Sequence, residues 1–271
     1  MKRACVVAAC LVVLVLSVPL ANRASAAEDS CGADPTPPCF SLYGDYRTIW
    51  RDGVFYVENF NTGTGQAVPF GNPTDTPVMG RLKDPNFTSF AVFRSGVWFV
   101  SDTTVSSATA FSFSYGDPGD VPVVGNWEGT DGVVTTSLQG PGVFRDGVWY
   151  LRNTASTGVA DLVVHYGDPG DTPIVGDWDG NGTDTIGVVR GNTWYLRNSN
   201  TSGAADIVLT FGDPGDAPVV GDWDFQDNTS TPGVYRNGIW YERNTATSGT
   251  ADQTFAYGDP GDRPFTAQSA T

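Results

Sequence analysis

The sequence contains only two lysines, two methionines and one histidine among its 271 residues. Lysine, methionine, glutamate and leucine favour helices, whereas valine, threonine and the aromatic residues, which are plentiful here, favour strands. The 33 glycines and 18 prolines supply turns between such strands. This composition disfavours a helix bundle or a doubly wound α/β fold, and the length suits one large all-β domain.

Basic residues are also scarce. The sequence has 15 basic and 30 acidic residues, which gives a net charge of -15. A chain this acidic repels the phosphates of nucleic acids and the surface of anionic membranes. We therefore expect no nucleic-acid partner and no membrane insertion. The charge suits cations, neutral sugars or basic proteins as partners.

The first residues have the pattern of a secretory signal peptide. Lys2 and Arg3 precede an apolar run over 4–16, and Ala24-Ser25-Ala26 is a small-residue cleavage site. The alternative, a transmembrane anchor, needs roughly 20 apolar residues, and this run is shorter. We expect residues 1–26 to be removed and the protein to be secreted.

Few cysteines remain after such a cleavage, since Cys5 and Cys10 belong to the signal peptide. Cys31 and Cys39 lie in a proline-rich segment, 27–42. Two cysteines in an exported chain most simply form one disulfide, whereas a metal site would need further ligands nearby.

Two short motifs recur five times in step. The first is an aromatic residue followed by Gly-Asp-Pro-Gly-Asp or a degraded copy, with its first glycine at Gly71, Gly116, Gly167, Gly212 and Gly258. The second resembles Arg-x-Gly-x-Trp-Tyr and starts at Arg51, Arg94, Arg145, Arg190 and Arg236. A repeat of about 45 residues has the size of a four-stranded propeller blade.

One clean repeat predicts strands over 173–178, 185–190, 193–197 and 205–211. The last of these is apolar at successive positions, which predicts a strand covered on both faces. The ends of the repeat region, 43–265, match a second and a first strand, so that together they complete a fifth blade. We predict a closed five-bladed β-propeller followed by a short tail, 266–271; an open solenoid of five units would need caps, and none is visible.

One loop carries a metal-binding pattern. Oxygen ligands alternate in Asp177, Asp179, Asn181 and the carbonyl of Thr183, and Asp184 or Thr185 would complete the shell. Ca²⁺ takes six to eight hard oxygen ligands, and Gly180 and Gly182 allow the loop to curl around it. The alternative is an acidic Asx-turn hairpin. A weaker second loop contains Asp222, Asp224 and Gln226.

The stretch Val175 to Arg190, with its Asp-Trp-Asp-Gly-Asn-Gly-Thr-Asp core, resembles the calcium-loop repeats of the FG-GAP/VCBS type, known from integrin-α-like propellers and secreted bacterial proteins. This resemblance implies a propeller with calcium in the hairpin loop between the first two strands of a blade. The sequence departs from it in lacking the literal Phe-Gly…Gly-Ala-Pro motif and in having five units instead of seven.

Catalysis has little support in the sequence. His165 stands alone, without a nucleophile motif. Glycoside hydrolysis needs only two carboxylates, but most acids recur in every repeat, which indicates a role in folding. Glu58, Glu128 and Glu242 are the unmatched candidates. The Trp-Tyr pairs are interpreted as core residues, because both faces of a blade are buried.

We therefore expect a monomeric, secreted, calcium-binding module for extracellular glycans or proteins, without chemistry of its own. The variable segments 60–67, 101–109, 128–142, 153–160, 198–204 and 244–251 and the five inter-blade grooves are the candidate ligand surfaces. Repeated grooves would add avidity. The alternatives are a hydrolase acting on polysaccharides and a modulator of a secreted protease.

Overall fold

The computed structural model describes residues 46–59, 64–85, 87–101, 108–129, 138–224, 226–227 and 229–267. These residues form twenty strands, and none of them is helical. In this part of the chain there is accordingly no helix long and apolar enough to cross a membrane. The predicted signal peptide and the predicted Cys31–Cys39 disulfide lie outside the described residues.

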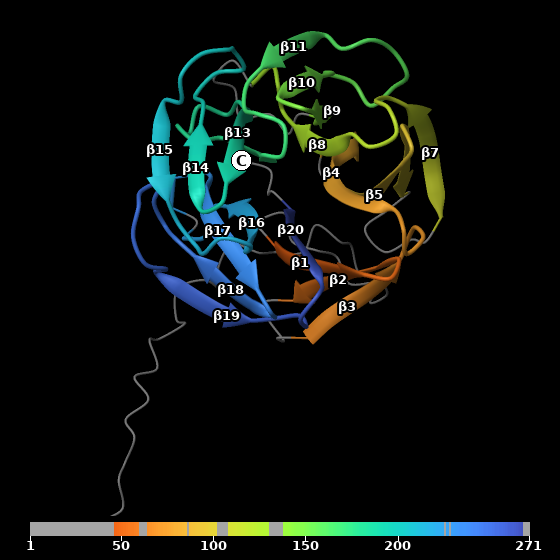
Figure 1. Ribbon diagram of the computed structural model, residues 1–271. Coiled ribbons are helices and arrows are strands. Elements are labelled where there is room, and N and C mark those ends of the chain that lie inside the picture. The colour runs from red at the N-terminus through yellow and green to blue at the C-terminus, as the bar shows by residue number, and fades with distance from the viewer. Residues whose placement is uncertain are drawn as a thin grey trace, which may run out of the picture. The chain divides into compact units, whose positions relative to one another are not determined.

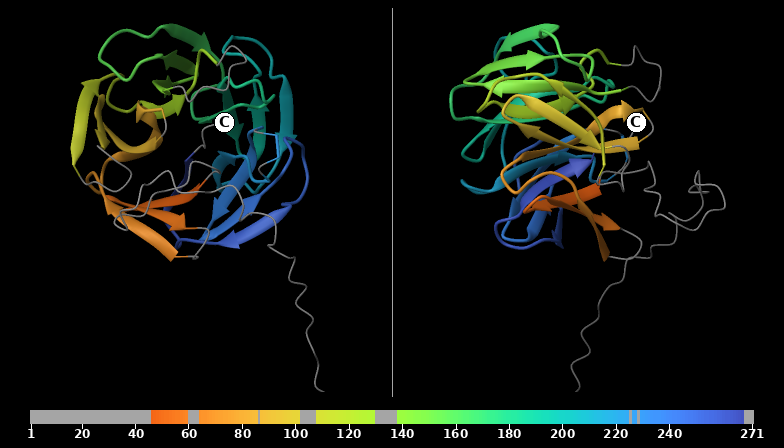
Figure 2. Two further views of the ribbon diagram at one scale, coloured as in Figure 1. Left: turned by 180° about the vertical axis from the view of Figure 1, so that it is seen from behind. Right: turned by 90° about the vertical axis from the view of Figure 1, so that its right-hand side faces the viewer.

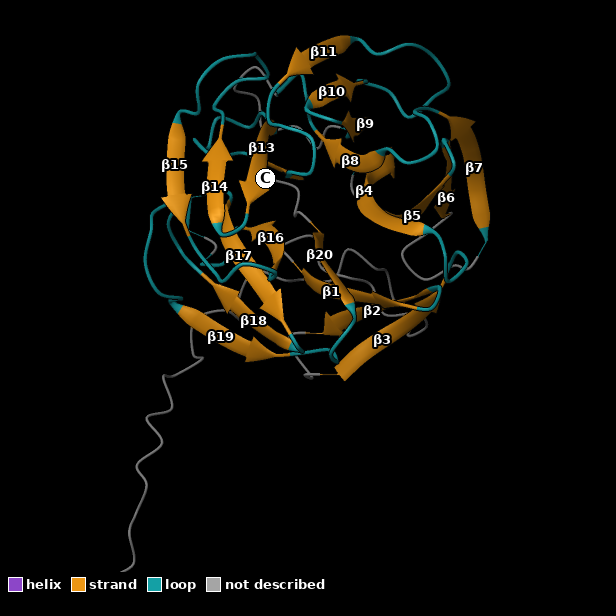
Figure 3. Ribbon diagram, in the orientation of Figure 1, coloured by secondary structure: helices purple, strands orange, loops and turns teal. Residues whose placement is uncertain are grey.

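The strands form five four-stranded antiparallel sheets, arranged as the blades of a propeller (Figures 1 and 3). Blade 1 comprises β4 (Thr76–Asp84), β5 (Phe87–Arg94), β6 (Val97–Ser101) and β7 (Thr109–Ser114). Blade 2 comprises β8 (Val121–Gly125), β9 (Gly140–Arg145), β10 (Val148–Leu151) and β11 (Leu162–His165). Blade 3 comprises β12 (Thr172–Gly176), β13 (Thr185–Arg190), β14 (Thr193–Leu196) and β15 (Ile207–Thr210). Blade 4 comprises β16 (Ala217–Gly221), β17 (Thr231–Arg236), β18 (Ile239–Glu242) and β19 (Gln253–Ala256).

The fifth sheet, here called the closing blade, joins the two ends of the repeat region. It comprises β20 (Arg263–Ala267), β1 (Tyr46–Arg51), β2 (Val54–Asn59) and β3 (Thr64–Pro69). β20 pairs antiparallel with β1, with Tyr46 opposite Ala267 and Trp50 opposite Arg263. The inner strands β4, β8, β12, β16 and β20 contact one another in a closed circle. The predicted five-bladed ring and its joint closure are both confirmed.

Both repeated motifs encode turns. In the second motif, Asp146 and Gly147 both have positive φ, at 49° and 85°, and Asn237 and Gly238 do the same at 51° and 86°. Two successive positive φ values define the tight hairpin turn that matches the twist of antiparallel strands. In the first motif, Asp120 donates its N–H to the carbonyl of Asp117, and Gly119 between them has a φ of 96°. This is a turn with proline second and glycine third.

The tryptophans of the second motif tie the two motifs together. Trp98, Trp149, Trp194 and Trp240 are fully buried, each between two blades. Each indole N–H donates to the carbonyl of the aromatic residue that opens the first motif, as from Trp149 to Tyr166 at 2.9 Å. The interpretation of the Trp-Tyr pairs as core residues is confirmed for the tryptophans but not for the partner rings, such as Tyr195, which are half-buried. The indole hydrogen bond explains why the two motifs keep step.

The strand limits differ slightly from the prediction. β12 ends at Gly176, two residues early, and β15 covers 207–210 within the predicted 205–211. The expectation that the fourth strand is covered on both faces is wrong, because Val208 is 59% exposed while Leu209 is buried. The outermost strand of a blade lies on the rim, where the neighbouring blade no longer covers its outer face (Figure 1).

Strand alternation gives the ring two different faces (Figure 2). The face that we call the loop face carries the loops between first and second and between third and fourth strands. The opposite face, the turn face, carries the hairpins and the turns that lead from blade to blade. On the axis, the inner strands line a cavity of about 190 Å³, with Met79, Val124, Val175, Val220 and Phe265 each from a different strand.

Candidate functional site

The predicted calcium loop joins β12 to β13 and folds around Asp177. The Asp177 carboxylate accepts hydrogen bonds from the backbone N–H groups of Asn181, at 3.0 Å, and Gly182, at 2.7 Å. Gly180 and Gly182 have positive φ values of 70° and 84°, which lets the loop turn this tightly. The Asn181 side-chain oxygen accepts from the N–H of Thr183 in turn. The loop therefore curls as the glycine spacing predicted.

Burial raises the pKa of Asp177 to about 6, against the two backbone hydrogen bonds, and the negative charges of Asp184 and Asp179 raise it further. A buried carboxyl with further acids beside it is an environment that a bound cation would stabilise. Asp179 itself is exposed at the tip of the loop.

Two predicted ligands of this loop have other partners. The Asp184 carboxylate accepts from the N–H of Asn126 at 2.7 Å and from the side-chain amide of Gln139 at 3.2 Å, both in blade 2. The hydroxyl of Thr185 donates to the carbonyls of Gly176 and Arg197. These two side chains therefore connect structural elements.

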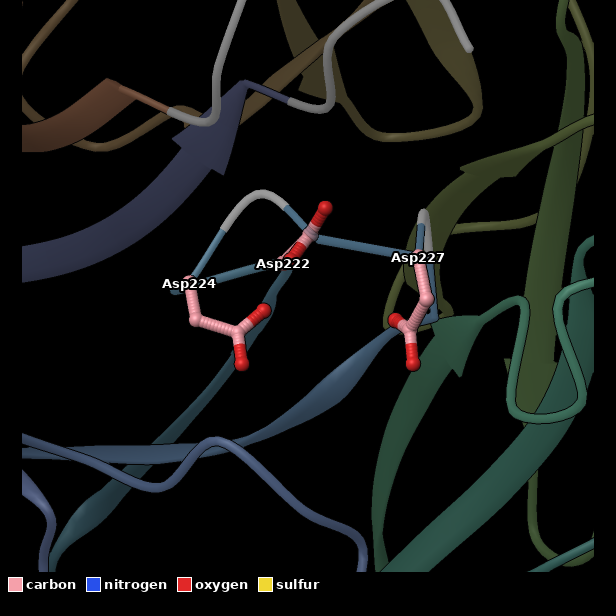
Figure 4. A group of neighbouring side chains, drawn as sticks. All are labelled: Asp222, Asp224 and Asp227. Carbon is pink, nitrogen blue, oxygen red and sulfur yellow. The ribbon is translucent and has the colours of Figure 1, made fainter. Parts of the chain in front are cut away.

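The second loop, between β16 and β17, holds the group of three acidic side chains that the described residues bring together. Oxygens of Asp222, Asp224 and Asp227 lie within 4.8 Å of one another (Figure 4). The sequence predicted Gln226 as the third member, but its side chain donates to the carbonyl of Asp224 instead. Asp227 escaped the prediction because it breaks the alternating spacing that guided it. Three carboxylates are ligands of the kind that Ca²⁺ prefers.

Reciprocal hydrogen bonds link the loops of successive blades on the loop face at three junctions, from blade 1 to blade 4. The backbone of Gln139 bonds to the carbonyl of Arg81 while its side chain accepts from the N–H of Arg81. Asp184 and Asn126 repeat this exchange one blade further on, and Ser230 and Asp177 repeat it again. Gln139, Asp184 and Ser230 occupy equivalent positions with different side chains.

The acids that recur in every repeat form clamps on the turn face. Arg190 donates to both oxygens of Asp171, at 2.7 and 2.8 Å, and also to Asp168, while its guanidinium lies 5.5 Å from the ring centre of Tyr195. The hydrogen bond from Arg190 lowers the pKa of Asp171, outweighing the effect of its burial. The same clamp involves Arg51, Arg94, Arg145 and Arg236. The repeated acids at these positions therefore pair with arginines within the fold.

The unmatched acids also have structural partners. Glu242 is fully buried and receives two hydrogen bonds from Arg47, which also bonds to Glu58 at 3.1 Å. Glu128 accepts a hydrogen bond from the side-chain amide of Asn153. A substrate cannot reach Glu242 in this position.

A groove of about 340 Å³ opens between blades 2 and 3. Its lining includes the half-buried ring of Tyr195, the exposed His165, and the clamp side chains Asp168 and Arg190, which are 67% and 50% exposed. Tyr166 also lines it, and the buried hydroxyl of Tyr166 has no hydrogen-bond partner. Burial raises the pKa of Tyr166 to about 12, so this hydroxyl stays protonated and able to donate.

His165 contributes its backbone to the same seam. Its N–H donates to the hydroxyl of Ser202 in the next blade at 3.2 Å, and Ser114 and Thr210 make the same contact in their own seams. The imidazole is exposed on the rim of the groove. The interpretation as an ordinary strand histidine fits this placement.

Comparison with known proteins assigns this chain to no family. No family model matches the chain, and no curated protein matches it. Among solved structures, a lectin from Agrocybe aegerita that recognises non-reducing terminal N-acetylglucosamine is 11% identical, with a TM-score of 0.47 over 86% of this chain and 73% of that one. A chain of the mitotic checkpoint complex is 14% identical, with a TM-score of 0.40 over 90% of this chain and 76% of that one.

Proposed function

We propose that this protein is a secreted binding module whose ligands are extracellular glycans, held in grooves between neighbouring blades. The observation that carries the proposal is the groove between blades 2 and 3. The half-buried aromatic ring of Tyr195 and exposed acidic and basic side chains line this groove of about 340 Å³. Sugar-sized pockets with a few placed polar groups around an aromatic surface are typical of small-ligand sites. A secreted protein is the second partner class that the sequence favours.

Binding without chemistry of its own is part of the proposal. The three unmatched glutamates, Glu58, Glu128 and Glu242, are engaged with Arg47 or Asn153. Glycoside hydrolysis needs two accessible carboxylates flanking the scissile bond. The fully buried Glu242 does not meet that requirement.

A glycan array probed with the full chain tests the glycan ligand. Tyr195→Leu removes the aromatic ring while keeping an apolar side chain, and we expect it to weaken every signal. Tyr56→Leu is the matched control, because Tyr56 lies in the same way under Arg51 in the closing blade. An array without signal, together with capture of one defined protein from the native medium, would favour the protein partner instead.

We also propose that calcium stabilises the ring at the loop after β12 and at the loop after β16. The resemblance to FG-GAP/VCBS repeats and the curled backbone around Asp177 support the first site, and the three clustered carboxylates support the second. A ligand at 100 times its dissociation constant adds about 2.7 kcal/mol to the free energy of unfolding. Asp179→Ala and Asp224→Ala should each remove part of the rise in melting temperature with calcium. An unchanged rise in both variants would contradict the assignment.

A further inference from the structure

Three consecutive seams of the described structure share one kind of loop. In blades 2, 3 and 4, the loop from the third to the fourth strand wraps around an arginine, and we call these the arginine-centred loops, 152–161, 197–206 and 243–252. The guanidinium of Arg197 donates to the carbonyls of Thr201 and Ala204. Arg152 and Arg243 repeat this pattern with the carbonyls four and seven residues ahead.

Each arginine-centred loop closes down on the preceding blade. Hydroxyls of Thr157, Ser202 and Ser248 accept hydrogen bonds from the backbone at the rim strand of that blade. The end of each loop is fixed by a carboxylate, as Asp206 accepts from the N–H of Asn198 at 2.8 Å. The loops therefore link neighbouring blades by hydrogen bonds at the three seams.

The groove residues recur at these three seams and also at the seam between blade 4 and the closing blade, where they are Asp259, Arg51 and Tyr56. The positions of Asp168, Arg190 and Tyr195 are taken by Asp117, Arg145 and Tyr150 between blades 1 and 2. Between blades 3 and 4 they are taken by Asp213, Arg236 and Tyr241. The first aspartate of each set is exposed by about two thirds, at 67 to 69%.

The two seams of the closing blade are built differently. Glu58 and Ser101 stand where the other blades have the central arginine of the loop. Glu58 turns to the buried Arg47, which also holds Glu242 across the seam from blade 4. The interior of this seam is thereby occupied by an ion group that secures closure.

We propose that the protein is a trivalent binder of an uncharged, repeating polysaccharide, with one site at each of the three seams that carry an arginine-centred loop. The proposal rests on the glycan-binding function proposed above and narrows it. Each site presents an already paired Asp–Arg couple, whose spare lone pairs and N–H groups suit hydroxyls better than charges. The net charge of -15 also repels a polyanion. Equivalent sites on successive blades suit a ligand that repeats, because the second and third contacts become intramolecular.

Affinity electrophoresis in gels containing a soluble β-glucan, galactomannan, arabinoxylan or alginate tests this proposal. We expect one uncharged polysaccharide to retard the full chain and alginate not to. Asp117→Ala, Asp168→Ala and Asp213→Ala should each weaken retardation at least tenfold through lost avidity, and the triple variant should migrate as in an empty gel. Asp259→Ala is the matched control, since Asp259 pairs with Arg51 in the same turn and is 68% exposed, at a seam where Glu58 replaces the central arginine of the loop.

The outcomes separate the two proposals. If no polysaccharide retards the wild-type chain and the glycan array is also silent, the proposed glycan function fails, and this inference fails with it. If the wild-type chain is retarded but the triple variant still binds, or Asp259→Ala weakens binding as much as the others, only the three-seam assignment is overturned. Retardation by alginate alone overturns the uncharged class of ligand.

Discussion

The ion group at the closing seam allows one sharp test of how the ring is held shut. Arg47 and Glu242 are 5% and 0% exposed, and Arg47 donates to both oxygens of that carboxylate. Removing one partner of a buried ion pair costs about 3–5 kcal/mol, because it leaves an uncompensated buried charge. We therefore expect Arg47→Ile to lower the free energy of unfolding by about that amount. For a domain of this size, this corresponds to a melting temperature lower by roughly 6–20 °C.

The other seams provide the matched repair. At the seam between blades 2 and 3, the equivalent positions are Leu151 and Ile186, which pack together in one apolar cluster. Replacing a buried ion pair by apolar residues is often neutral or stabilising. Arg47→Ile combined with Glu242→Leu and Glu58→Gln should therefore recover most of the lost stability. Glu58→Gln is included because Glu58 would otherwise lose the same arginine.

Acid provides an independent check on the same pair. Burial raises the pKa of Glu242, and the hydrogen bond and charge of Arg47 only partly offset that effect. A carboxyl with a raised folded-state pKa binds its proton more tightly in the folded state, so stability rises as pH falls through that pKa. The deficit of Arg47→Ile, measured by urea unfolding, should thus be smaller at pH 5 than at pH 7. A deficit below about 1 kcal/mol at pH 7, or one that the repaired variant retains in full, would refute the reasoning.

Two further predictions concern single groups described above. Tyr166→Phe removes a buried hydroxyl that has no partner, so the free energy of unfolding should stay equal or rise by up to about 1 kcal/mol. Tyr235→Phe should lower it by about 1 kcal/mol, because the Tyr235 hydroxyl donates to the carbonyl of Asp259 at 2.6 Å. Equal losses in both variants, measured by denaturant unfolding, would contradict this. The pKa of Asp171 is lowered by its hydrogen bond from Arg190, so the stability from this clamp is present above about pH 4 and is lost as pH falls through the lowered value. Arg190→Gln should therefore lower stability at pH 7 and flatten its fall below pH 4, and a parallel acid profile for variant and wild type would disprove the clamp.

Much of the fold could be predicted from the sequence because each repeat forms the same turns and the same buried contacts with the same residue types. The Asp-Gly and Asn-Gly hairpins, the Asp-Pro-Gly-Asp turns and the buried tryptophans depend on neighbours within one or two strands. Their spacing therefore indicates four strands to a blade and five blades to the ring. The composite closing blade followed from matching the two ends to the missing strands.

The remaining features depend on contacts between residues that are distant in the sequence and do not belong to the repeated motifs. Arg47 and Glu242 are 195 positions apart and each replaces an apolar residue of the other blades. Gln139, Asp184 and Ser230 each accept a backbone hydrogen bond from the preceding blade, with three different side chains. The sequence pattern therefore predicts Asp184 as a calcium ligand, although its carboxylate links two blades. Asp227 joins Asp222 and Asp224 only because of the path that the loop takes, and the alternating spacing of the sequence does not predict that path.

The closing blade also has a consequence for how the chain folds. Tyr46 in β1 pairs with Ala267 in β20, so one edge of β1 stays unpaired until nearly the whole described chain is available. Contacts across such sequence distances form slowly, since the long intervening chain must first be gathered in. The pairing of β1 with β20, which closes the ring, is therefore expected to be a late step of folding, after the four other blades have formed.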